Sequence, residues 1–331
     1  KMKKHLLLLS LSFVTTYASI AQGTWTQKAN FGGVARQCAV GFSIGTKGYI
    51  GTGQAGSGYK QDFWEWDQAT NVWTQKADFG GTARREATGF SIGTKGYIGT
   101  GQDGSGYKKD FWEWDQATNI WTQKTDFGGT ARYDAAGFSF GTKGYIVTGW
   151  NGAYPADFWE WDQTTDVWVQ KANFGGAARE EAVGFSIGTK GYVGAGYINS
   201  ALRQDFWEWD QATNVWTQRA NFGGTARNGA IGFSIGSKGY LGTGEDGSNF
   251  LKDFWEWDQS TNVWIQRTSF GGTARVGAVG FSVGTKGYIV TGVYTSSISK
   301  MKDFWEWDQG GNTWTKKTDL RYECSVCKKT H

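Results

Sequence analysis

Short runs of alternating apolar and polar residues, separated by glycine-rich turns, repeat along the chain. In one copy, four such runs cover Ala87–Ile92, Tyr97–Gly101, Phe111–Asp115 and Ile120–Lys124, and we label them strands A, B, C and D of a unit. A period of two over five or six residues predicts β-strands. The turn Gly93-Thr94-Lys95-Gly96 predicts a tight hairpin between A and B. No segment shows the 3.6-residue period of an amphipathic helix.

The unit occurs six times. The block D-F-W-E-W-D-Q-A-T-N-V-W runs from Asp62 to Trp73, and near copies begin at Asp110, Asp157, Asp205, Asp253 and Asp303. Gly-Phe pairs at positions 41, 89, 137, 184, 232 and 280 give a period of 47 or 48 residues. A period near fifty with four strands per unit indicates the blades of a β-propeller, because helical repeats are shorter.

Composition agrees with an all-β fold. The chain of 331 residues contains 51 Gly, 20 Trp, 21 Phe and 14 Tyr, but one Pro. Aromatic residues favour strands, and glycine favours tight turns. Because neighbouring blades pack face to face, we expect small residues such as Gly41 and Ser43 to accept Trp64 and Trp66 of the next blade.

The units resemble the kelch repeat family over nearly all of the chain after the leader. The resemblance rests on the glycine that closes strand B, on Asp67, Thr70 and Trp73 of the C–D region, and on the arginine that opens strand A. The doubled glycine of the family is here Gly-Thr-Gly or Val-Thr-Gly in five of the six units. The resemblance implies four-stranded blades around a central channel, with strand A innermost.

The number of blades has two interpretations. Thr24–Lys28 is an isolated strand D, six units follow it, and the sixth has its own D segment around Trp314. Arg321-Tyr322-Glu323 then looks like the start of another strand A. We expect six complete blades with a spare strand; the alternative is a truncated seven-bladed propeller.

The first 21 residues have the layout of a secretory signal. Lys3-Lys4-His5 precede an apolar run from Leu6 to Val14, and Ser19-Ile20-Ala21 supplies small residues before Gln22. We therefore expect a signal peptide at 1–21, a propeller at 22–320 and an irregular tail at 321–331, in a secreted, periplasmic or cell-surface protein. The apolar run is too short for a membrane span.

Charge gives no argument for nucleic acid. The formal net charge is +4, and without the leader 31 basic residues face 30 acidic ones. A nearly neutral protein lacks the basic surface that binds nucleic acid or an anionic membrane. We expect a monomer.

The differences between the copies gather in two places. The A–B turn is Gly-Thr-Lys-Gly five times and Gly-Ser-Lys-Gly once, and the C–D turn is nearly constant. The pair after each arginine and the B–C loop vary. Up-and-down topology places the D–A connections and B–C loops on one face, which we call the variable face. Loops that bind ligands diverge from their scaffold, although drift alone also produces divergence.

Three groups of residues are candidates on this face. The first is the arginines, which in the family can contact acidic ligands but could instead bridge blades through carboxylates: Arg36, Arg84, Arg132, Arg179, Arg227 and Arg275. The second is three of the variable pairs: Arg85, Glu86, Tyr133, Asp134, Glu180 and Glu181. The third is the loop aromatics, which suit sugar rings and peptides or fold back on neighbouring blades: Tyr59, Tyr107, Trp150, Tyr154, Tyr197, Phe250 and Tyr294.

Other chemistry has weaker support. The carboxylates of the repeated Asp-Phe-Trp-Glu-Trp-Asp block are interpreted as structural, because they occur equally in every copy. Cys324 and Cys327 with His331 lack the fourth ligand of a structural zinc site. Copper-radical oxidases of the kelch type need two histidines at the metal. The two histidines of this chain are His5, in the leader, and His331, at the end, so we do not expect that chemistry. We expect no metal and no cofactor.

Three functions fit these patterns. The first is an exported binding module that recognises a glycan or a protein through the variable face. The second is a metal-free sugar mutarotase or epimerase, similar to a kelch sialic-acid mutarotase and using Arg132, Arg179, Glu180 and Glu181. The third is a purely structural surface repeat. We expect the first and no enzymatic activity.

Overall fold

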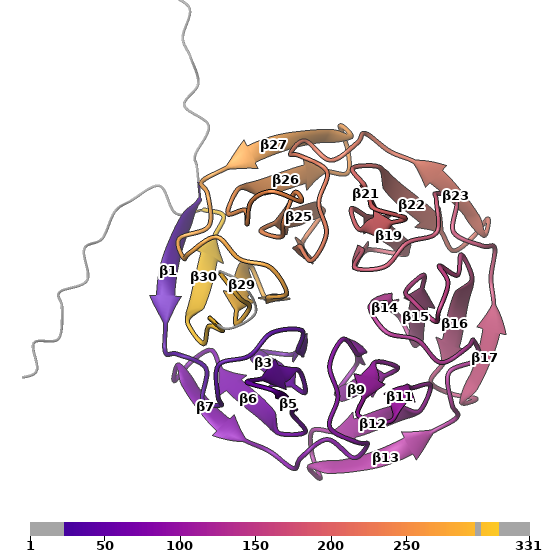
Figure 1. Cartoon of the computed structure of the whole chain (residues 1–331), viewed down its shortest axis with the longest axis vertical. Helices are drawn as coiled ribbons and strands as arrows, with labels where there is room; N and C mark the ends of the chain where they lie inside the picture. Colours follow the sequence, from indigo (N-terminus) through magenta and orange to yellow (C-terminus); the bar gives the residue numbers. More distant parts are fainter. Residues whose placement is uncertain (1–22, 295–298, 311–331) are drawn as a thin grey trace, which may run out of the picture.

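The protein is a six-bladed β-propeller. The computed structural model describes residues 23–294 and 299–310, and these form six four-stranded antiparallel sheets around a central channel (Figure 1). Within this part of the chain there is no helix, and so no helix that could cross a membrane. The predicted fold class and number of blades are confirmed. The predicted leader, the tail from 321 and the segment around Trp314 lie outside the described residues.

Blades 1 to 5 are built in chain order from the channel outward, and blade 6 takes its outer strand from the start of the ring. Blade 1 contains β2 (Val40–Ile44), β3 (Lys47–Gly51), β6 (Phe63–Asp67) and β7 (Val72–Gln75). Blade 2 contains β8 (Thr88–Ile92), β9 (Lys95–Gly99), β12 (Phe111–Asp115) and β13 (Ile120–Lys124). Blade 3 contains β14 (Ala136–Phe140), β15 (Lys143–Val147), β16 (Phe158–Asp162) and β17 (Val167–Gln170).

The second half of the ring repeats the arrangement. Blade 4 contains β18 (Val183–Ile187), β19 (Lys190–Gly194), β22 (Phe206–Asp210) and β23 (Val215–Gln218). Blade 5 contains β24 (Ile231–Ile235), β25 (Lys238–Gly242), β26 (Phe254–Asp258) and β27 (Val263–Arg267). Blade 6 contains β28 (Val279–Val283), β29 (Lys286–Val290), β30 (Phe304–Asp308) and β1 (Thr24–Lys28).

Strand B differs from its predicted bounds by two residues. It was expected at Tyr97–Gly101, but β9 is Lys95–Gly99, because Ile92 already pairs with Lys95 across a two-residue turn. The strand ends at Gly99 because the next two residues have positive φ, 59° at Thr100 and 94° at Gly101. Two left-handed residues in succession turn the chain out of the sheet.

The N-terminal strand closes the ring. β1 pairs with β30 in antiparallel register, from Thr24 opposite Asp308 to Lys28 opposite Phe304. Figure 1 shows this indigo strand beside the yellow end of the chain. The expectation that Thr24–Lys28 is spare is therefore wrong. This strand takes the D position of blade 6, because β30 needs a partner along its outer edge.

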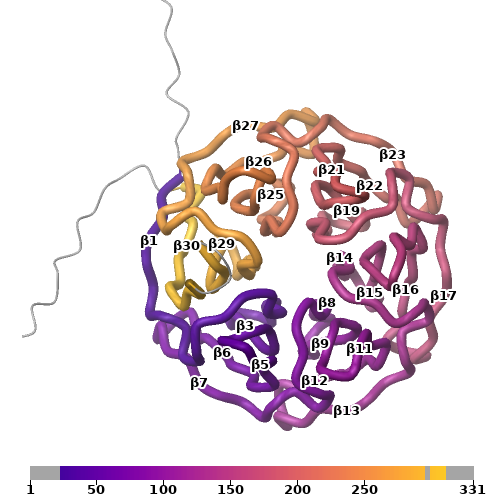
Figure 2. Tube along the Cα trace, in the orientation of Figure 1, coloured from indigo at the N-terminus to yellow at the C-terminus, as the bar shows by residue number. Residues whose placement is uncertain are grey.

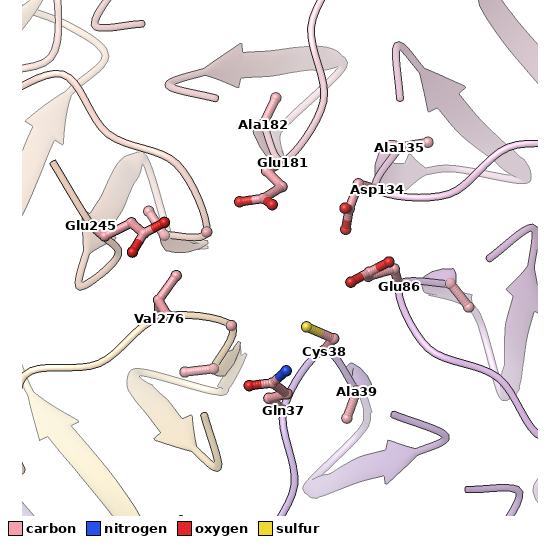
Figure 3. Close-up of a pocket in the computed structure, with 15 residues that line it drawn as sticks. Gln37, Cys38, Ala39, Glu86, Asp134, Ala135, Glu181, Ala182, Glu245 and Val276 are labelled. Carbon is pink, nitrogen blue, oxygen red and sulfur yellow. The ribbon is translucent and has the colours of Figure 1, made fainter. Parts of the chain in front are cut away.

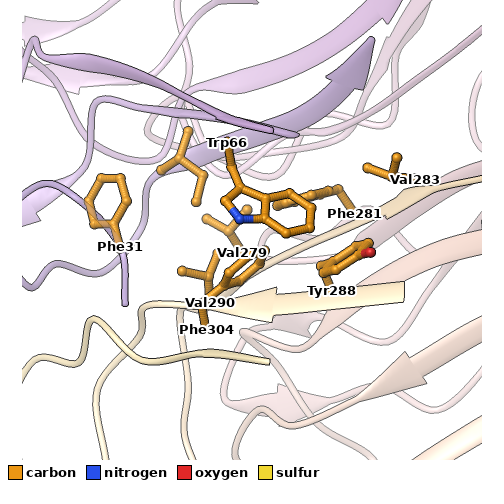
Figure 4. Packing of buried hydrophobic residues seen from close by; sticks show 9 residues of the cluster. Phe31, Trp66, Val279, Phe281, Val283, Tyr288, Val290 and Phe304 are labelled. Atoms are coloured by element: carbon orange, nitrogen blue, oxygen red, sulfur yellow. The ribbon is translucent and has the colours of Figure 1, made fainter. Parts of the chain in front are cut away.

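Aromatic residues fill the spaces between blades. Trp66 is fully buried, with its ring centroid 4.9 Å from Tyr288 and 4.8 Å from Phe304 of blade 6 (Figure 4). The predicted pairing of small and large residues needs correction. A Cβ on Gly41 would lie 2.1 Å from Val279, so this glycine faces valine rather than tryptophan.

Candidate functional site

The two variable regions meet in every blade. The first residue of the variable pair forms a β-bridge with the first residue of the B–C loop: Gln37 with Gln54, Arg85 with Gln102, Tyr133 with Trp150, Glu180 with Tyr197, Asn228 with Glu245, and Val276 with Val293. In blades 1, 2 and 4 the loop continues as a two-stranded hairpin: β4 (Gln54–Ala55) with β5 (Gly58–Tyr59), β10 (Gln102–Asp103) with β11 (Gly106–Tyr107), and β20 (Tyr197–Ile198) with β21 (Ala201–Leu202). Both kinds of variation therefore shape one surface.

The second residues of the variable pairs encircle the channel, and we call them the mouth ring. Each has a left-handed backbone, with φ between 51° and 63°: Cys38, Glu86, Asp134, Glu181, Gly229 and Gly277. Backbone hydrogen bonds link successive members, as from Glu86 N to Cys38 O at 3.0 Å and from Asp134 N to Glu86 O at 3.1 Å. Figure 2 shows the innermost strands β8 and β14 at the edge of the central opening. The repeat thus holds four different residue types in one backbone geometry.

The mouth ring encloses a cavity of about 320 Å³. In Figure 3 the carboxyl groups of Glu86, Asp134 and Glu181 and the thiol of Cys38 point toward its centre. On the side of blades 5 and 6, Gly229 and Gly277 carry no side chain, and Glu245 and Val276 line the cavity instead. Below lies a second cavity of about 200 Å³, lined by the Ala-x-Gly segments of the six innermost strands. The mouth is therefore acidic on one side and continues into a narrow channel.

Burial and like charge perturb the acids of the mouth. Burial, followed by Glu86 and Glu181, raises the pKa of Asp134 well above its ordinary value. Burial raises the pKa of Glu86, although the charge of Arg85 opposes it. The pKa of Glu181 rises to about 7 through burial and the charges of Glu180 and Glu86. Burial and Glu86 raise the pKa of Glu180 to about 7 as well.

Burial and acidic neighbours also affect the thiol of Cys38 in the mouth ring. Burial, and then the charges of Glu86 and Asp134, raise the pKa of Cys38 well above its ordinary value. This cysteine forms no disulfide among the described residues. The environment therefore makes Cys38 a poor nucleophile at neutral pH.

Few donors satisfy these carboxylates. Glu181 Oε2 accepts a hydrogen bond from Asn228 Nδ2 at 2.7 Å, and Arg85 NH1 lies 3.2 Å from Glu86 Oε1. Glu86 Oε2 is buried and has no hydrogen-bond partner among the described residues. An unpartnered buried carboxylate oxygen is costly, so it marks a place where a donor would be stabilising.

Four of the candidate aromatics form one cluster at the rim of blades 2 and 3. The ring centroids of Tyr107 and Tyr133 lie 5.1 Å apart, and those of Trp150 and Tyr154 lie 4.6 Å apart. Trp150 Nε1 donates to the Tyr107 hydroxyl at 3.3 Å, which joins the two pairs. Because Tyr133 immediately precedes Asp134, the cluster stands beside the acidic side of the mouth.

The remaining candidate aromatics are spread around the rim. Tyr59 lies under the guanidinium of Arg85, with its ring centroid 5.8 Å away. Tyr197 is bridged to Glu180, and Phe250 is bridged to Glu245. Tyr294 in the loop of blade 6 is 41% exposed. These four do not join the cluster of blades 2 and 3.

The six candidate arginines are fully buried beneath the surface. Arg36 donates to both carboxylate oxygens of Asp62, at 2.8 and 2.6 Å, and to the Thr52 carbonyl at 2.8 Å. Its guanidinium also lies 4.9 Å from the Phe31 ring centroid. The other five repeat this fork with Asp110, Asp157, Asp205, Asp253 and Asp303. This geometry corresponds to the structural interpretation of the arginines.

The carboxylates of the repeated block also serve the scaffold. Glu65 accepts hydrogen bonds from Lys47 Nζ at 2.7 Å and from the Tyr49 hydroxyl at 2.8 Å. Asp67 Oδ1 accepts from the backbone N–H of Ala69 at 2.9 Å, which closes the C–D turn. Across the described ranges, no group of three or more Asp, Glu, His or Cys residues is arranged to hold a metal ion. Cys324, Cys327 and His331 lie outside those ranges.

Several residues of the site are not among the sequence predictions, and the most polar of them are Cys38, Asn228 and Glu245. Cys38 and Asn228 belong to variable pairs, and Glu245 belongs to a B–C loop. The signal for Glu245 was present, because it occupies the loop position that Trp150 and Tyr197 hold in other blades.

Comparisons with known proteins add information on the fold alone. No family model matches the chain. No curated protein matches it either. Among solved structures, a chain described as "Structure of YjhT" is similar with a TM-score of 0.71 and 16% identity, over 83% of this chain and 95% of that one. At this identity the likeness supports the propeller fold and does not identify a ligand.

Proposed function

We propose that the protein is a binding module whose ligand, a glycan or a partner protein, sits on the channel mouth of the variable face. The observation that carries this proposal is the mouth ring. There a single backbone position holds Cys, Glu, Asp, Glu, Gly and Gly in the six blades, while the surrounding scaffold is nearly unchanged.

Stability alone does not account for these side chains. A left-handed backbone suits glycine, as at Gly229 and Gly277, and costs about 1 kcal/mol or more for other residues. Placing Glu86, Asp134 and Glu181 there also brings like charges together in a buried site. Strain and unfavourable charge gathered at one cavity are typical of functional sites.

The proposal includes an extracytoplasmic setting. Its support is the leader pattern at residues 1–21 and the neutral composition after it. Propeller faces are also widely used for binding, because rigid blades hold loops of any sequence in fixed positions.

An array of glycans and proteins tests the function. We expect the wild-type chain to bind a ligand that a Trp150→Ala/Tyr197→Ala variant binds at least tenfold more weakly. The matched control is Val72→Ala/Ile120→Ala, which alters two exposed apolar side chains at the opposite face and should bind normally. Binding that is equal in all three proteins would contradict the proposal. Failure of the wild type to bind anything would favour the purely structural repeat.

One observation favours a second candidate, a metal-free sugar mutarotase or epimerase. Glu180 and Glu181 both have a pKa of about 7, which suits general acid–base catalysis at neutral pH. Arg132 and Arg179 would not assist, because both are fully buried in ion pairs. Anomerisation of free sugars, followed by NMR in the wild type and in Glu181→Gln, distinguishes this enzyme from the binding module.

A further inference from the structure

Glu86 is the most unusual residue of the mouth. Its side chain is 9% exposed, it lines the cavity, and its Oε2 atom lacks a hydrogen-bond partner among the described residues. Its contact with Arg85 NH1, at 3.2 Å, involves the other oxygen. A buried acceptor aimed into a cavity indicates that the ligand supplies a donor.

The groups facing the cavity are mostly acidic. Among the described residues, the cationic groups that interact with the mouth are Arg85 and Lys300. The acidic groups that interact there are Cys38, Glu86, Asp134, Glu180, Glu181 and Glu245. Arg85 is directed to Glu86, and Lys300 Nζ donates to the Gly56 carbonyl at 2.7 Å. The cluster therefore needs additional positive charge to be stable in its ionised form.

The shape of the site favours a slender cation. Glu86, Asp134 and Glu181 come from three successive blades and point into one cavity of about 320 Å³ (Figure 3). An ammonium group has three donors, which matches three convergent carboxylates, whereas a guanidinium is a wide, planar fork. The cavity narrows to a channel lined by Ala and Gly, and aromatic rings stand at the rim beside Asp134.

We propose that the channel mouth binds a primary ammonium group carried on an unbranched alkyl chain, with the ammonium among Glu86, Asp134 and Glu181 and the chain passing the aromatic rim. This inference rests on the proposed binding function and, of its two ligand classes, specifies a partner protein that presents a lysine side chain. A free diamine shares this chemistry but lies outside that proposal, and the experiment below distinguishes the two sources.

Binding should be linked to proton release. Burial, followed by the charges of Glu180 and Glu86, raises the pKa of Glu181 to about 7. A bound cation would stabilise the ionised carboxylate, so this pKa would fall and a proton would be released. Affinity should therefore increase as pH rises from 6 to 8. If one carboxyl group with a pKa of about 7 must lose its proton, the affinity for the amine rises about tenfold between pH 6 and pH 8.

Titration calorimetry of the whole chain with cadaverine tests the inference. We expect saturable binding of cadaverine and none of 1,5-pentanediol, which has the same length without charge. Glu86→Gln should raise the dissociation constant for cadaverine about tenfold or more. A tenfold change is what the loss of one modest charge–charge contact produces. Asp126→Asn removes the same charge from a carboxylate that is 42% exposed and ion-paired with Lys109, and should leave binding unchanged.

Further ligands identify the source of the amine. Binding of Nα-acetyl-lysine-methylamide in preference to cadaverine would indicate a partner protein, and the reverse would indicate a free diamine. Glu86→Gln keeps the size of the side chain but removes the ion partner of Arg85, so its unfolding temperature is measured beside its affinity. A second variant, Asp134→Asn, repeats the test at another position.

Two outcomes would overturn the inference: absence of amine binding, or equal affinity in Glu86→Gln, Asp134→Asn and Asp126→Asn. Either result, together with an array ligand that depends on Trp150 and Tyr197, would reject the ammonium site and leave the binding module intact. No array ligand at all would reject the proposed function itself.

Discussion

The buried arginines hold a backbone position that would otherwise be unfavourable. Thr52 and its counterparts have positive φ, between 57° and 63°, and they are Thr or Ala rather than Gly: Thr52, Thr100, Thr148, Ala195, Thr243 and Thr291. In each blade the arginine NH1 donates to the carbonyl oxygen of this residue. The guanidinium therefore ties strand B to the carboxylate that precedes strand C.

Removing one arginine should be strongly destabilising. Arg132→Met leaves Asp157 without its ion partner and the Thr148 carbonyl without its donor, so we expect a loss of about 3 kcal/mol in the free energy of unfolding. Denaturant unfolding followed by tryptophan fluorescence measures it. Arg132→Met/Asp157→Asn should recover part of the loss, because no charge is then left unpaired.

A surface ion pair provides the matched comparison. Lys143→Met removes a cation whose side chain is 26% exposed and which is paired with Asp162, and should cost less than about 1 kcal/mol. If Arg132→Met costs no more than Lys143→Met, the arginines do not hold the scaffold.

The mouth carboxylates should make stability fall as pH rises. Because burial and neighbouring charges raise the pKa of Glu181 to about 7, the folded protein binds a proton more tightly than the unfolded chain does. Stability is then greatest below pH 4.5 for this group and is lost between about 4.5 and 7. We expect Glu181→Gln to have a higher melting temperature relative to wild type at pH 7.5 than at pH 5. An equal difference at both pH values would contradict the raised pKa.

At the scale of elements, the packing between blades depends on a glycine in each innermost strand. A Cβ on Gly89 would lie 2.1 Å from Val40 Cγ1, whereas a Cβ on Gly184 would lie 3.2 Å from Ala136, which stands where the other blades carry a larger residue. At the same glycine of the repeat, a methyl group would therefore need only a small shift of its neighbours in blade 4, whereas it would overlap a valine in blade 2.

This difference gives a controlled test of blade packing. Gly89→Ala should destabilise the protein by about 2 kcal/mol through overpacking, while Gly184→Ala should cost less than 1 kcal/mol. Val40→Ala/Gly89→Ala should be more stable than Gly89→Ala alone, because the smaller residue makes room for the new methyl group. Equal costs for Gly89→Ala and Gly184→Ala in thermal unfolding would show that the interface relaxes freely.

The strands could be predicted from the sequence, but their partners across blades could not. Alternation and turn residues are local signals, so Phe111–Asp115 and Ile120–Lys124 match β12 and β13 residue for residue. That Gly41 faces Val279 depends on how two blades are offset, which no local pattern records. The variable face was found by comparing the copies, yet burial of the arginines required knowing the depth of each side chain.

At the scale of the whole molecule, the ring is closed by β1, which pairs with a strand that is distant from it in the sequence. β13 follows β12 through the C–D turn, whereas β1 is far from β30 in sequence and pairs with it only through the ladder and side-chain packing. Trp25 of β1 contacts Phe254, Phe270 and Trp307, with ring centroids 5.0 to 5.3 Å away.

Closure should therefore be the weakest point of the ring. Within the described residues no turn joins β1 to β30, so β1 can separate from blade 6 without deforming a tight connection such as the C–D turn between β12 and β13. We expect backbone amides of β1 and β30 to exchange with deuterium faster than those of β13 and β12. Equal rates in native-state hydrogen exchange would mean that the ring opens only on global unfolding.

The central claim is that ligand binds at the mouth ring of the variable face. The most direct measurement is a crystal structure of the whole chain soaked with the strongest ligand from the array. The account predicts electron density for the ligand within reach of Glu86, Asp134 and Glu181. Full occupancy at the A–B/C–D face or at the outer strands, with the mouth empty, would contradict it.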